Sequence, residues 1–425
     1  MMSIRKNKGF ALVFSLLFLT LIILFTAVFF LTATHGFVIA NRNADLKRAY
    51  YVADAGIADA FIQLRGYANP PASFTVTNAN YNLGSGQNGS YSVTAVSNGA
   101  PWATYTLTST GTYNNLTKTL VLVVQQSSIS TYAYLSNTEI HPQYGALWWI
   151  TGMTTVGPVR TNGQLNIWGK PIFNGTVNQS AATVNYYNGG PPTDDPNYVY
   201  GLTVNAPTVP FPTTSMLNSI SSAASSSSML LTGNSTVVFN SNGTINVTNS
   251  AKGWNNQNMV LPSNRTIYVT GGSATVQGTL NGQLTVGSDR EIYISGNLMY
   301  NSDPRTNPAS TDLLGLVARN NITVTAASAP SNLELDAVLV ALTGSFQVDQ
   351  WWVSGKGNMI QYGSLVNNYC GPTGVFDPST GTLYGGYNQL QYYDTRLKTN
   401  IPPAFPPATD STGRSLYVKL SFQEL

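Results

Sequence analysis

The sequence predicts an α+β protein with a long N-terminal helix, transmembrane and then amphipathic, a small antiparallel sheet, and a mainly β domain built as a parallel β-helix or solenoid. Three observations carry this fold class. Residues 10–31 contain no charge, apolar residues then recur at helical spacing, and the rest of the chain alternates short strand-like runs with Gly and Asn turns. The predicted parts are a basic segment (1–9), the helix (10–66, membrane span about 10–34), the small sheet (67–126) and the β domain (127–425, insertion about 207–231).

The N-terminal apolar run is long enough to span a bilayer. As a helix, residues 10–31 would extend ~33 Å, against a hydrocarbon core of about 30 Å. A cleaved secretory signal has a shorter apolar stretch and an A-x-A-like site, which the following LTATHGF does not offer. The basic residues Arg5, Lys6 and Lys8 place the N-terminus in the cytoplasm and everything after Thr32 outside. A single-pass anchor for an external domain is the alternative interpretation.

The helix is predicted to continue past the membrane. No Pro or turn cluster interrupts the sequence before Pro70. Gly36 and Gly56 are the points where the helix could bend, because Gly costs about 1 kcal/mol relative to Ala. The apolar stripe of the second half consists of Leu46, Ala49, Tyr50, Ala53, Ile57, Ala60, Phe61 and Leu64.

The N-terminal segment resembles the class III leader of type IV prepilins. A basic leader ends in Gly9, Phe-Ala-Leu-Val follows, and the apolar helix runs into an amphipathic half. In that family a membrane peptidase cuts after the Gly and methylates the new N-terminal residue, so the resemblance implies a mature chain that starts at Phe10. The segment RAYYVADAGIADA is similar to a region of PilX-type minor pilin-like proteins, with Asp54 where Glu is common. Major pilins carry Glu where this chain has Phe14, which favours a minor or initiating subunit.

The resemblance also implies partners and a location. A prepilin meets the prepilin peptidase and the inner-membrane pilus assembly machinery, and its helix packs against other pilins. The protein would be a single-pass membrane protein before assembly and part of an extracellular pilus or the cell surface afterwards. The overall architecture resembles that of large competence minor pilins, which join a pilin module to a β-solenoid.

The residues after the helix predict a small antiparallel sheet. Thr104–Thr110 and Thr117–Val124 have alternating strand patterns and flank an Asn-Asn turn at Asn114 and Asn115, which predicts a hairpin. Such a sheet, packed on the second half of the helix, would form a pilin head.

Beyond Gln126 the strands become shorter and recur at no fixed length, with Gly or Asn at their corners. This pattern favours a β-solenoid over a β-sandwich. Within the insertion, Met216, Leu217 and Ile220 lie at helical spacing and predict a short helix packed on the solenoid, with a flexible Ser linker as the alternative. The tail QLQYYDTRLKTNIPPAFPP resembles that of PilX-type proteins with a large β-helical domain.

Composition argues against an enzyme. Charged residues make up 9% of the chain, there are two His and one Cys, and no P-loop, G-x-G-x-x-G, H-E-x-x-H or C-x-x-C occurs. Cys370 has no partner for an internal disulfide and is expected to be buried. No metal or cofactor is expected, because the runs that begin at Asp194 and Asp377 are typical of turns. The nearest charged candidates for β-helix catalysis are Glu334, Asp336, Asp349 and Lys356.

Adjacent aromatic pairs are the candidate binding residues. Neighbours on a strand point to opposite faces, so at least one member of each pair is expected to face outward or to lie in a loop. Such rings stack on sugars or on bases, and covering the ends of the solenoid is their structural alternative. The pairs are Trp148-Trp149, Trp351-Trp352, Tyr186-Tyr187 and Tyr392-Tyr393.

Charge decides between the two ligand classes. Without Arg5, Lys6 and Lys8, the chain carries 17 basic and 17 acidic residues, so nothing attracts nucleic acid in bulk. We therefore expect contact with a surface glycan or a protein rather than with DNA. The favoured function is a minor pilin-like subunit that initiates or caps a type IV pilus or related filament and presents the solenoid for adhesion. The alternatives are an anchored surface β-helix protein, a DNA-uptake pilus tip protein and, least favoured, a carbohydrate-active β-helix enzyme.

Overall fold

The chain divides into two units, which are described separately. The computed structural model describes residues 8–67, 70–98, 104–353, 355–377, 382–405, 408 and 414–425. Unit 1 comprises residues 1–98, 104–124 and 419–425, and unit 2 comprises residues 99–103 and 125–418. The predicted leader residues Arg5 and Lys6 lie outside the described residues.

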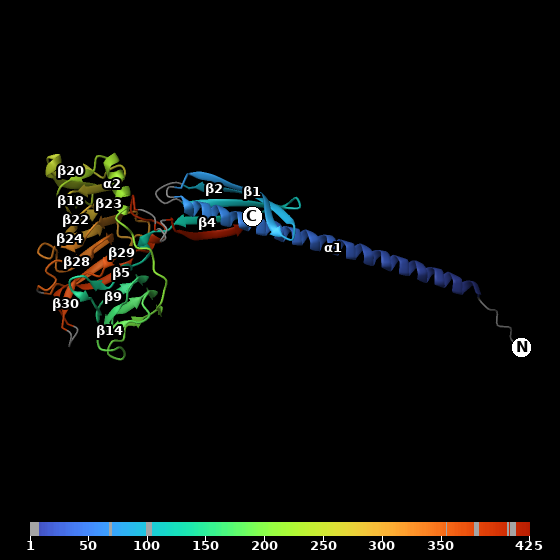
Figure 1. The fold of residues 1–425 in the computed structure, drawn as a ribbon, viewed down its shortest axis with the longest axis horizontal. Coiled ribbons are helices and arrows are strands. Elements are labelled where there is room, and N and C mark those ends of the chain that lie inside the picture. The colour runs from blue at the N-terminus through green and yellow to red at the C-terminus, as the bar shows by residue number, and fades with distance from the viewer. Residues whose placement is uncertain are drawn as a thin grey trace. The chain divides into compact units, whose positions relative to one another are not determined.

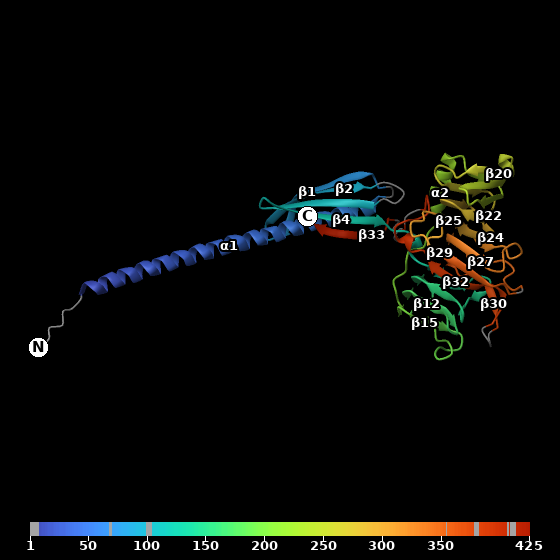
Figure 2. The same cartoon turned by 180° about the vertical axis from the view of Figure 1, so that it is seen from behind.

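Helix α1 (Lys8–Gly66) is continuous, as the sequence predicts. No other element of unit 1 lies beside its first half in either view (Figures 1 and 2). Apolar side chains on this half are exposed from Phe10 (72% exposed) to Ile39, somewhat beyond the predicted end of the membrane span. Among the described residues, this helix alone is long and apolar enough to cross a membrane. Such a surface is stable in lipid or against other apolar helices.

The second half of α1 packs on a five-stranded sheet. The strand order is β1-β2-β3-β4-β33, and β2 pairs antiparallel with both β1 and β3. The predicted hairpin is present: Asn114 and Asn115 both have positive φ, 46° and 62°, as a two-residue type I′ turn between β3 and β4 requires. The strands are β1 (Ser73–Gly84), β2 (Gln87–Ser97), β3 (Thr104–Tyr113), β4 (Leu116–Gln126) and β33 (Tyr417–Glu424).

The fifth strand corrects the predicted boundaries. The sequence predicts a β domain over residues 127–425, but residues 419–425 belong to unit 1. The backbone N–H of Leu425 donates to the carbonyl of Thr119 on β4 (3.0 Å), and Lys118 forms an ion pair with Glu424. The sequence could not assign this strand, because its partner lies about 300 residues away and strand register carries no signal at that distance.

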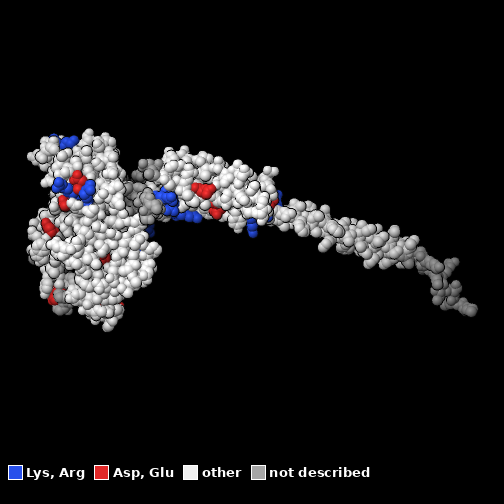
Figure 3. Space-filling view, viewed as in Figure 1, with Lys and Arg blue, Asp and Glu red and all other residues white. Residues whose placement is uncertain are grey.

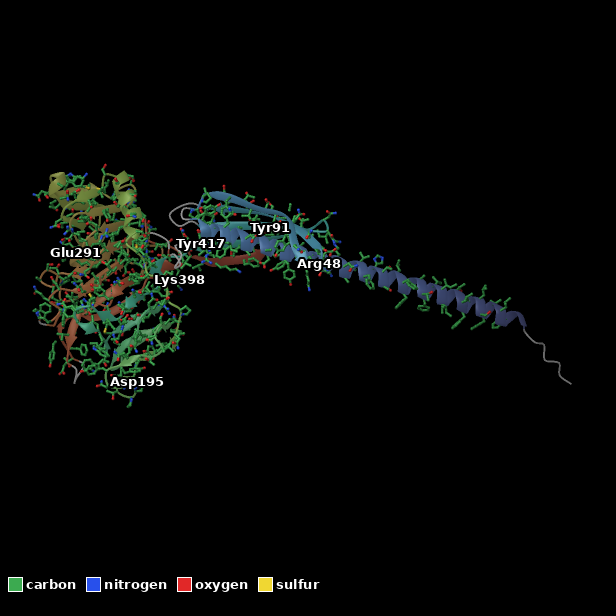
Figure 4. All side chains as sticks on the ribbon, in the orientation of Figure 1. Arg48, Tyr91, Asp195, Glu291, Lys398 and Tyr417 are labelled. Carbon is green, nitrogen blue, oxygen red and sulfur yellow. The ribbon has the colours of Figure 1, made fainter. Side chains whose placement is uncertain are left out.

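Helix and sheet meet through small residues. The buried face of α1 consists of Ala49, Val52, Ala53, Gly56, Ile57, Ala60 and Leu64. Val52 and Gly56 are not part of the predicted stripe, and its members Leu46, Tyr50 and Phe61 are only half-buried. The hydroxyl of Ser109 on β3 donates to the carbonyl of Ala53 (2.7 Å). A Cβ added at Gly111 would lie 2.3 Å from the backbone N of Ala53, so β3 approaches the helix as closely as backbone permits. Figure 4 shows Arg48 and Tyr91 along this contact; Arg48 lies over the ring of Tyr113 (5.3 Å) and Tyr91 donates to Asp59.

Unit 2 consists mainly of parallel strands stacked on one another. The longest stack runs in the order β17-β21-β23-β25-β27-β29-β5-β10-β13-β16, with every neighbouring pair parallel. Its strands are β17 (Leu230–Thr232), β21 (Thr266–Thr270), β23 (Gln283–Ser288), β25 (Leu313–Ala318), β27 (Leu333–Ala341), β29 (Asn358–Tyr369), β5 (Tyr134–Thr138), β10 (Val159–Thr161), β13 (Val177–Gln179) and β16 (Leu202–Thr203).

Two further stacks complete the core. One runs β18-β22-β24-β26-β28, and the other continues from β27 and β29 through β32, β9, β12 and β15. The strands are β18 (Ser235–Phe239), β22 (Ala274–Leu280), β24 (Ile292–Tyr300), β26 (Ile322–Val324), β28 (Phe346–Val348), β32 (Asn388–Tyr393), β9 (Thr154–Val156), β12 (Ile172–Asn174) and β15 (Asn197–Tyr198). Parallel stacks of short strands are what a β-solenoid requires; its regular winding stays a prediction.

The order of strands in these stacks is not the order of the chain. The chain begins in the middle at β5, proceeds to β16, and then restarts at the opposite end with β17, so that β29 finally pairs with β5. One end of unit 2 is marked by β14 in Figure 1 and by β15 in Figure 2, and α2 lies near the other end in both views. One buried apolar ladder crosses the junction where the two runs meet, with register partners Leu316, Leu339, Leu365, Tyr134, Val159 and Val177.

The predicted insertion makes the connection between the two ends. Residues 204–229 link β16 to β17 and contain α2 (Met216–Ser226), which confirms the short helix over the flexible linker. Met216, Leu217 and Ile220 are buried, and the helix packs on β21 and β23. The predicted tail packs beside it: Phe405 lies so close to Gly315 that a Cβ there would meet its ring at 2.3 Å. Helix and tail thus cover the outer face of the longest stack.

Antiparallel hairpins, a small parallel sheet and short 3-10 helices complete unit 2. Strands β19 (Thr244–Asn249) and β20 (Trp254–Val260) extend from β18, and a separate parallel sheet is formed by β8 (Trp149–Ile150), β11 (Asn166–Trp168) and β14 (Asn185–Tyr186). The remaining elements are the hairpins β6 (Ile140–His141) with β7 (Gly145–Ala146) and β30 (Gly374–Phe376) with β31 (Leu383–Gly386), and the 3-10 helices η1 (Ile129–Thr131), η2 (Ser250–Lys252) and η3 (Thr395–Lys398).

Candidate functional site

The candidate processing site lies at the start of α1. Gly9 and Phe10 both lie within the helix, and the Phe10 side chain is exposed. Phe14, one turn further on, is also exposed and contacts the Phe10 ring, with centroids 6.2 Å apart. The first half of the helix therefore begins with an apolar surface at the position where main pilin subunits carry Glu.

The structure separates the members of the first two predicted aromatic pairs. Trp149 is buried in the core between Tyr134 and Phe173, whereas Trp148 is half-buried at the surface. Trp352 is 59% exposed and Trp351 is half-buried, with their rings edge to face at 5.5 Å. In these pairs, at least one ring is accessible, as predicted.

The two tyrosine pairs differ from each other. Tyr187 is half exposed while Tyr186 packs against the core, which fits the prediction. Neither ring of the last pair is exposed: Tyr393 is buried and Tyr392 packs against the core. The prediction of an outward-facing member is wrong there, because Tyr392 packs against the core and Tyr393, on the other face, is buried in a cluster with Leu397 and Ile401 of the tail.

Several of the accessible rings line one cavity. Its volume is about 370 Å³, and Trp148, Trp351 and Tyr187 contribute to its wall. Trp168 stacks on Tyr187 with centroids 3.8 Å apart and planes 11° apart, and Phe376 meets Trp168 edge-on at 4.6 Å. The cavity is therefore built from rings on β11 and β30 and on four connecting segments, which carry Trp148, Tyr187, Trp351 and Tyr387. Trp352 does not line it.

Sequence reasoning missed three of the cavity residues. Trp168, Phe376 and Tyr387 are not members of adjacent aromatic pairs, so a search for pairs passes over them. No local signal indicates Trp168, because it is the only Trp or Tyr between Ile150 and Asn185 in the sequence. The contribution of Phe376 depends on the fold, because it reaches Trp168 only through the hairpin of β30 and β31.

The four charged residues that the sequence offers as catalytic candidates form hydrogen bonds or ion pairs within the protein. Lys356 donates to the backbone carbonyl of Ala329 (2.6 Å), and the Asp349 carboxylate accepts from the backbone N–H of Ala326 (2.6 Å). Asp336 is buried, accepts from the backbone N–H of Tyr300 (3.1 Å) and lies 3.5 Å from Arg305, which also pairs with Glu334. Burial raises the pKa of Asp336 to about 7. Each of the four groups thus has a partner in the protein.

A second buried carboxylate, Glu139, lies behind the cavity wall. It accepts hydrogen bonds from the Tyr134 hydroxyl (3.1 Å), the Trp149 indole N–H (3.3 Å) and Ser136. Burial raises its pKa despite these bonds. The adjacent Cys370, which the sequence predicts to be buried, is half-buried and lines the cavity. Desolvation of its thiol raises the thiol pKa well above its usual range, so the thiol stays protonated.

The turn at Asp194 is held by hydrogen bonds within the protein, and residues 378–381 of the run that begins at Asp377 lie outside the described residues. The Asp194 carboxylate accepts from the backbone N–H of Gly169 (2.8 Å) and from the Asn188 side chain (3.0 Å), and these bonds outweigh burial and lower its pKa. Figure 4 marks the neighbouring Asp195 at one end of unit 2. Within the described residues, no group of three or more His, Cys, Asp or Glu side chains could hold a metal ion.

Comparisons with known proteins do not assign a function to the chain. A family model described as a domain of unknown function, DUF4900, matches residues 89–182, a range with parts in both units. No curated protein matches the chain. The crystal structure of the competence-associated pilin ComZ from Thermus thermophilus resembles it at 12% identity, covering 90% of this chain and 97% of that one, with a TM-score of 0.37. A TM-score of 0.37 does not establish a shared fold.

Proposed function

We propose that this protein is a pilin-like minor subunit whose helix α1 joins a type IV pilus or related filament. One observation carries the proposal: a single unbroken helix is bare and apolar in its first half and forms the core of a small antiparallel sheet in its second half. A membrane anchor needs only the first property. In a filament subunit, the bare half of the helix packs among other subunits, and its unbroken continuation fixes the position of the sheet relative to them.

The sequence around the helix supports the same role. The leader ends in Gly9 directly before the apolar run, and the small residues of ADAG face the sheet at the point of closest contact. Phe14 stands where a main subunit would carry Glu, which fits a subunit present in few copies that initiates or caps the filament. Unit 2 would then be presented outside the cell for adhesion or contact with a partner.

Charge disfavours DNA as that partner. Only 13 of the 20 Lys and Arg residues follow Arg65, and they are spread over the rest of the chain. The face of unit 2 in Figure 3 is largely uncharged. Arg396, one of the closest pair with Lys398, is already bonded to Asp394 (2.6 Å). Phosphate binding requires several free cations together.

The proposal is tested by blocking processing in the native host. Gly9→Val should prevent cleavage while the apolar run still inserts, so the protein should remain in the membrane and disappear from sheared filaments. Gly36→Ala is the matched control, since it lies in the same apolar half and a Cβ there meets nothing within 4 Å. Recovery of the wild-type protein in the membrane fraction alone would favour the anchored surface protein instead.

A further inference from the structure

The aromatic cavity lies where the regular strand stacking of unit 2 is interrupted. Strand β28 pairs with β26 on one side, and on the other its Val348 N–H donates to the carbonyl of Pro372 (2.9 Å) in an irregular segment. Strand β8, which belongs to the other run of strands, pairs with β11. The segment of residues 370–376 and the β30–β31 hairpin bridge the interval, and the cavity lies beneath them.

The bridging segment is held tightly. A Cβ at Gly385 would lie 2.9 Å from the carbonyl oxygen of Trp351, and one at Gly386 would lie 2.2 Å from that of Thr373. The backbone N–H of Lys356 donates to the Gly386 carbonyl (2.8 Å), and the Tyr387 hydroxyl donates to the carbonyl of Pro330 (2.6 Å). These contacts fix Trp351 and Tyr387 in the wall, so the cavity is a preformed site.

The lining combines aromatic faces with neutral polar groups. Trp148 and Trp168 approach each other edge to face (6.4 Å), and Trp148 also meets Tyr187 edge-on at 5.1 Å. No residue of the lining carries a charge, and Asn388 and Gln389 stand among the apolar side chains. A volume of about 370 Å³ falls in the usual range for small-molecule sites.

Gln389 indicates that the occupant has hydroxyl or amide groups. Its side chain is only 7% exposed, lines the cavity, and forms no hydrogen bond with any residue in the part of the chain that the structure describes. The amide still reaches the open space of the cavity, so an occupant with hydrogen-bonding groups can bond to it there. An entirely apolar ligand would leave it unsatisfied, and an anionic ligand would find no cation.

We propose that this cavity binds a neutral saccharide, with one or two sugar units stacked against the tryptophan and tyrosine rings and their hydroxyls bonded to Gln389. Sugar rings present both an apolar C–H face and a polar edge, which matches a wall of this composition. The inference deepens the proposed surface role by naming the ligand class. Its physical basis is confined to unit 2 and does not depend on how the N-terminus is processed.

The test uses the full chain in lipid nanodiscs, because maltoside or glucoside detergents would compete for the site. Saturation-transfer NMR and tryptophan fluorescence are recorded with chitotriose, cellotriose, maltotriose and mannotriose, and with an uncharged apolar peptide as the rival ligand. At least one trisaccharide should bind. Trp351→Ala and Tyr187→Ala should each weaken it roughly tenfold, the scale of one lost stacking contact.

Trp352→Ala is the matched control. The residue adjoins Trp351 and is exposed, but it does not line the cavity, so its loss should leave the affinity unchanged. Tyr187→Phe, which keeps the ring, should restore binding, and Gln389→Leu should abolish saccharide binding while retaining the fold. Binding of the peptide alone, binding of none of the probes, or equal losses at positions 351 and 352 would overturn the proposal. None of these results bears on cleavage after Gly9.

Discussion

Gly111→Ala is the sharpest test of the contact between helix and sheet. The new Cβ would lie 2.3 Å from the backbone N of Ala53 and 2.4 Å from the carbonyl oxygen of Ala49. Real Cβ contacts essentially never fall below 3.0 Å, and both obstacles are helix backbone, which cannot rotate away. Helix α1 and strand β3 must therefore move apart by about 0.7 Å, which forfeits a quarter to a half of the dispersion attraction at that contact.

The expected loss of stability follows from that displacement. Overpacking typically costs about 1–3 kcal/mol, and an obstacle made of backbone belongs at the upper end, so we expect about 3 kcal/mol. For a unit of this size, that corresponds to a fall in the midpoint temperature of roughly 10–20 °C. Amide exchange in β2 and β3 should accelerate by about a hundredfold.

The assay is hydrogen exchange with mass spectrometry on the protein in nanodiscs, because it resolves unit 1 from unit 2. Gly66→Ala is the control, since nothing lies within 4 Å of a Cβ there. Gly56→Ala should cost less than Gly111→Ala, because its nearest obstacles are side-chain atoms, the Ser109 hydroxyl (2.6 Å) first, which can turn away at the loss of the hydroxyl's hydrogen bond to Ala53. Exchange in β3 of Gly111→Ala as slow as in Gly66→Ala would refute the close packing of helix on sheet.

Three further outcomes are expected. Burial raises the pKa of Asp336 to about 7, against about 4 in the unfolded chain. Between about pH 4 and pH 7 the folded protein therefore binds one more proton at Asp336 than the unfolded chain does. Stability should therefore fall as pH rises from about 4 to 7, and Asp336→Asn should flatten the slope of urea midpoints against pH; an unchanged slope would count against a buried carboxyl. Cys370, whose thiol pKa is raised by burial, should react with iodoacetamide at pH 8 roughly a hundredfold more slowly in the native protein than in urea, and equal rates would show an open thiol. Duplex DNA should show no salt-sensitive gel shift at micromolar protein, whereas such a shift would favour a DNA-uptake role.

The features that could be predicted from sequence are those set by local periodicity. Helix α1 follows from an uncharged run and a stripe at spacings of three and four, and the β3–β4 hairpin follows from the Asn114-Asn115 turn. Helix α2 follows from the spacing of its buried residues, Met216 and Leu217 among them. In each case the deciding interactions join residues close in the chain.

The features that sequence could not supply depend on distant pairing. The β29–β5 junction joins residues more than 200 positions apart, as Leu365 with Tyr134 shows, and no local pattern indicates that the strands start in the middle of their stack. The same holds for Trp168 and Phe376 in the cavity. Adjacent aromatic residues do alternate across a strand, but the rule cannot say whether the outer face is later covered, and at Tyr393 it is.

The central claim is that α1 belongs to a filament subunit matured at its N-terminus. Mass spectrometry of the N-terminal peptide of the protein from its native host tests this most directly. A mature chain that begins at Phe10, with the mass of an added methyl group, is the predicted result. A chain that still begins at Met1, or one cut after Thr34, would contradict the pilin-like assignment.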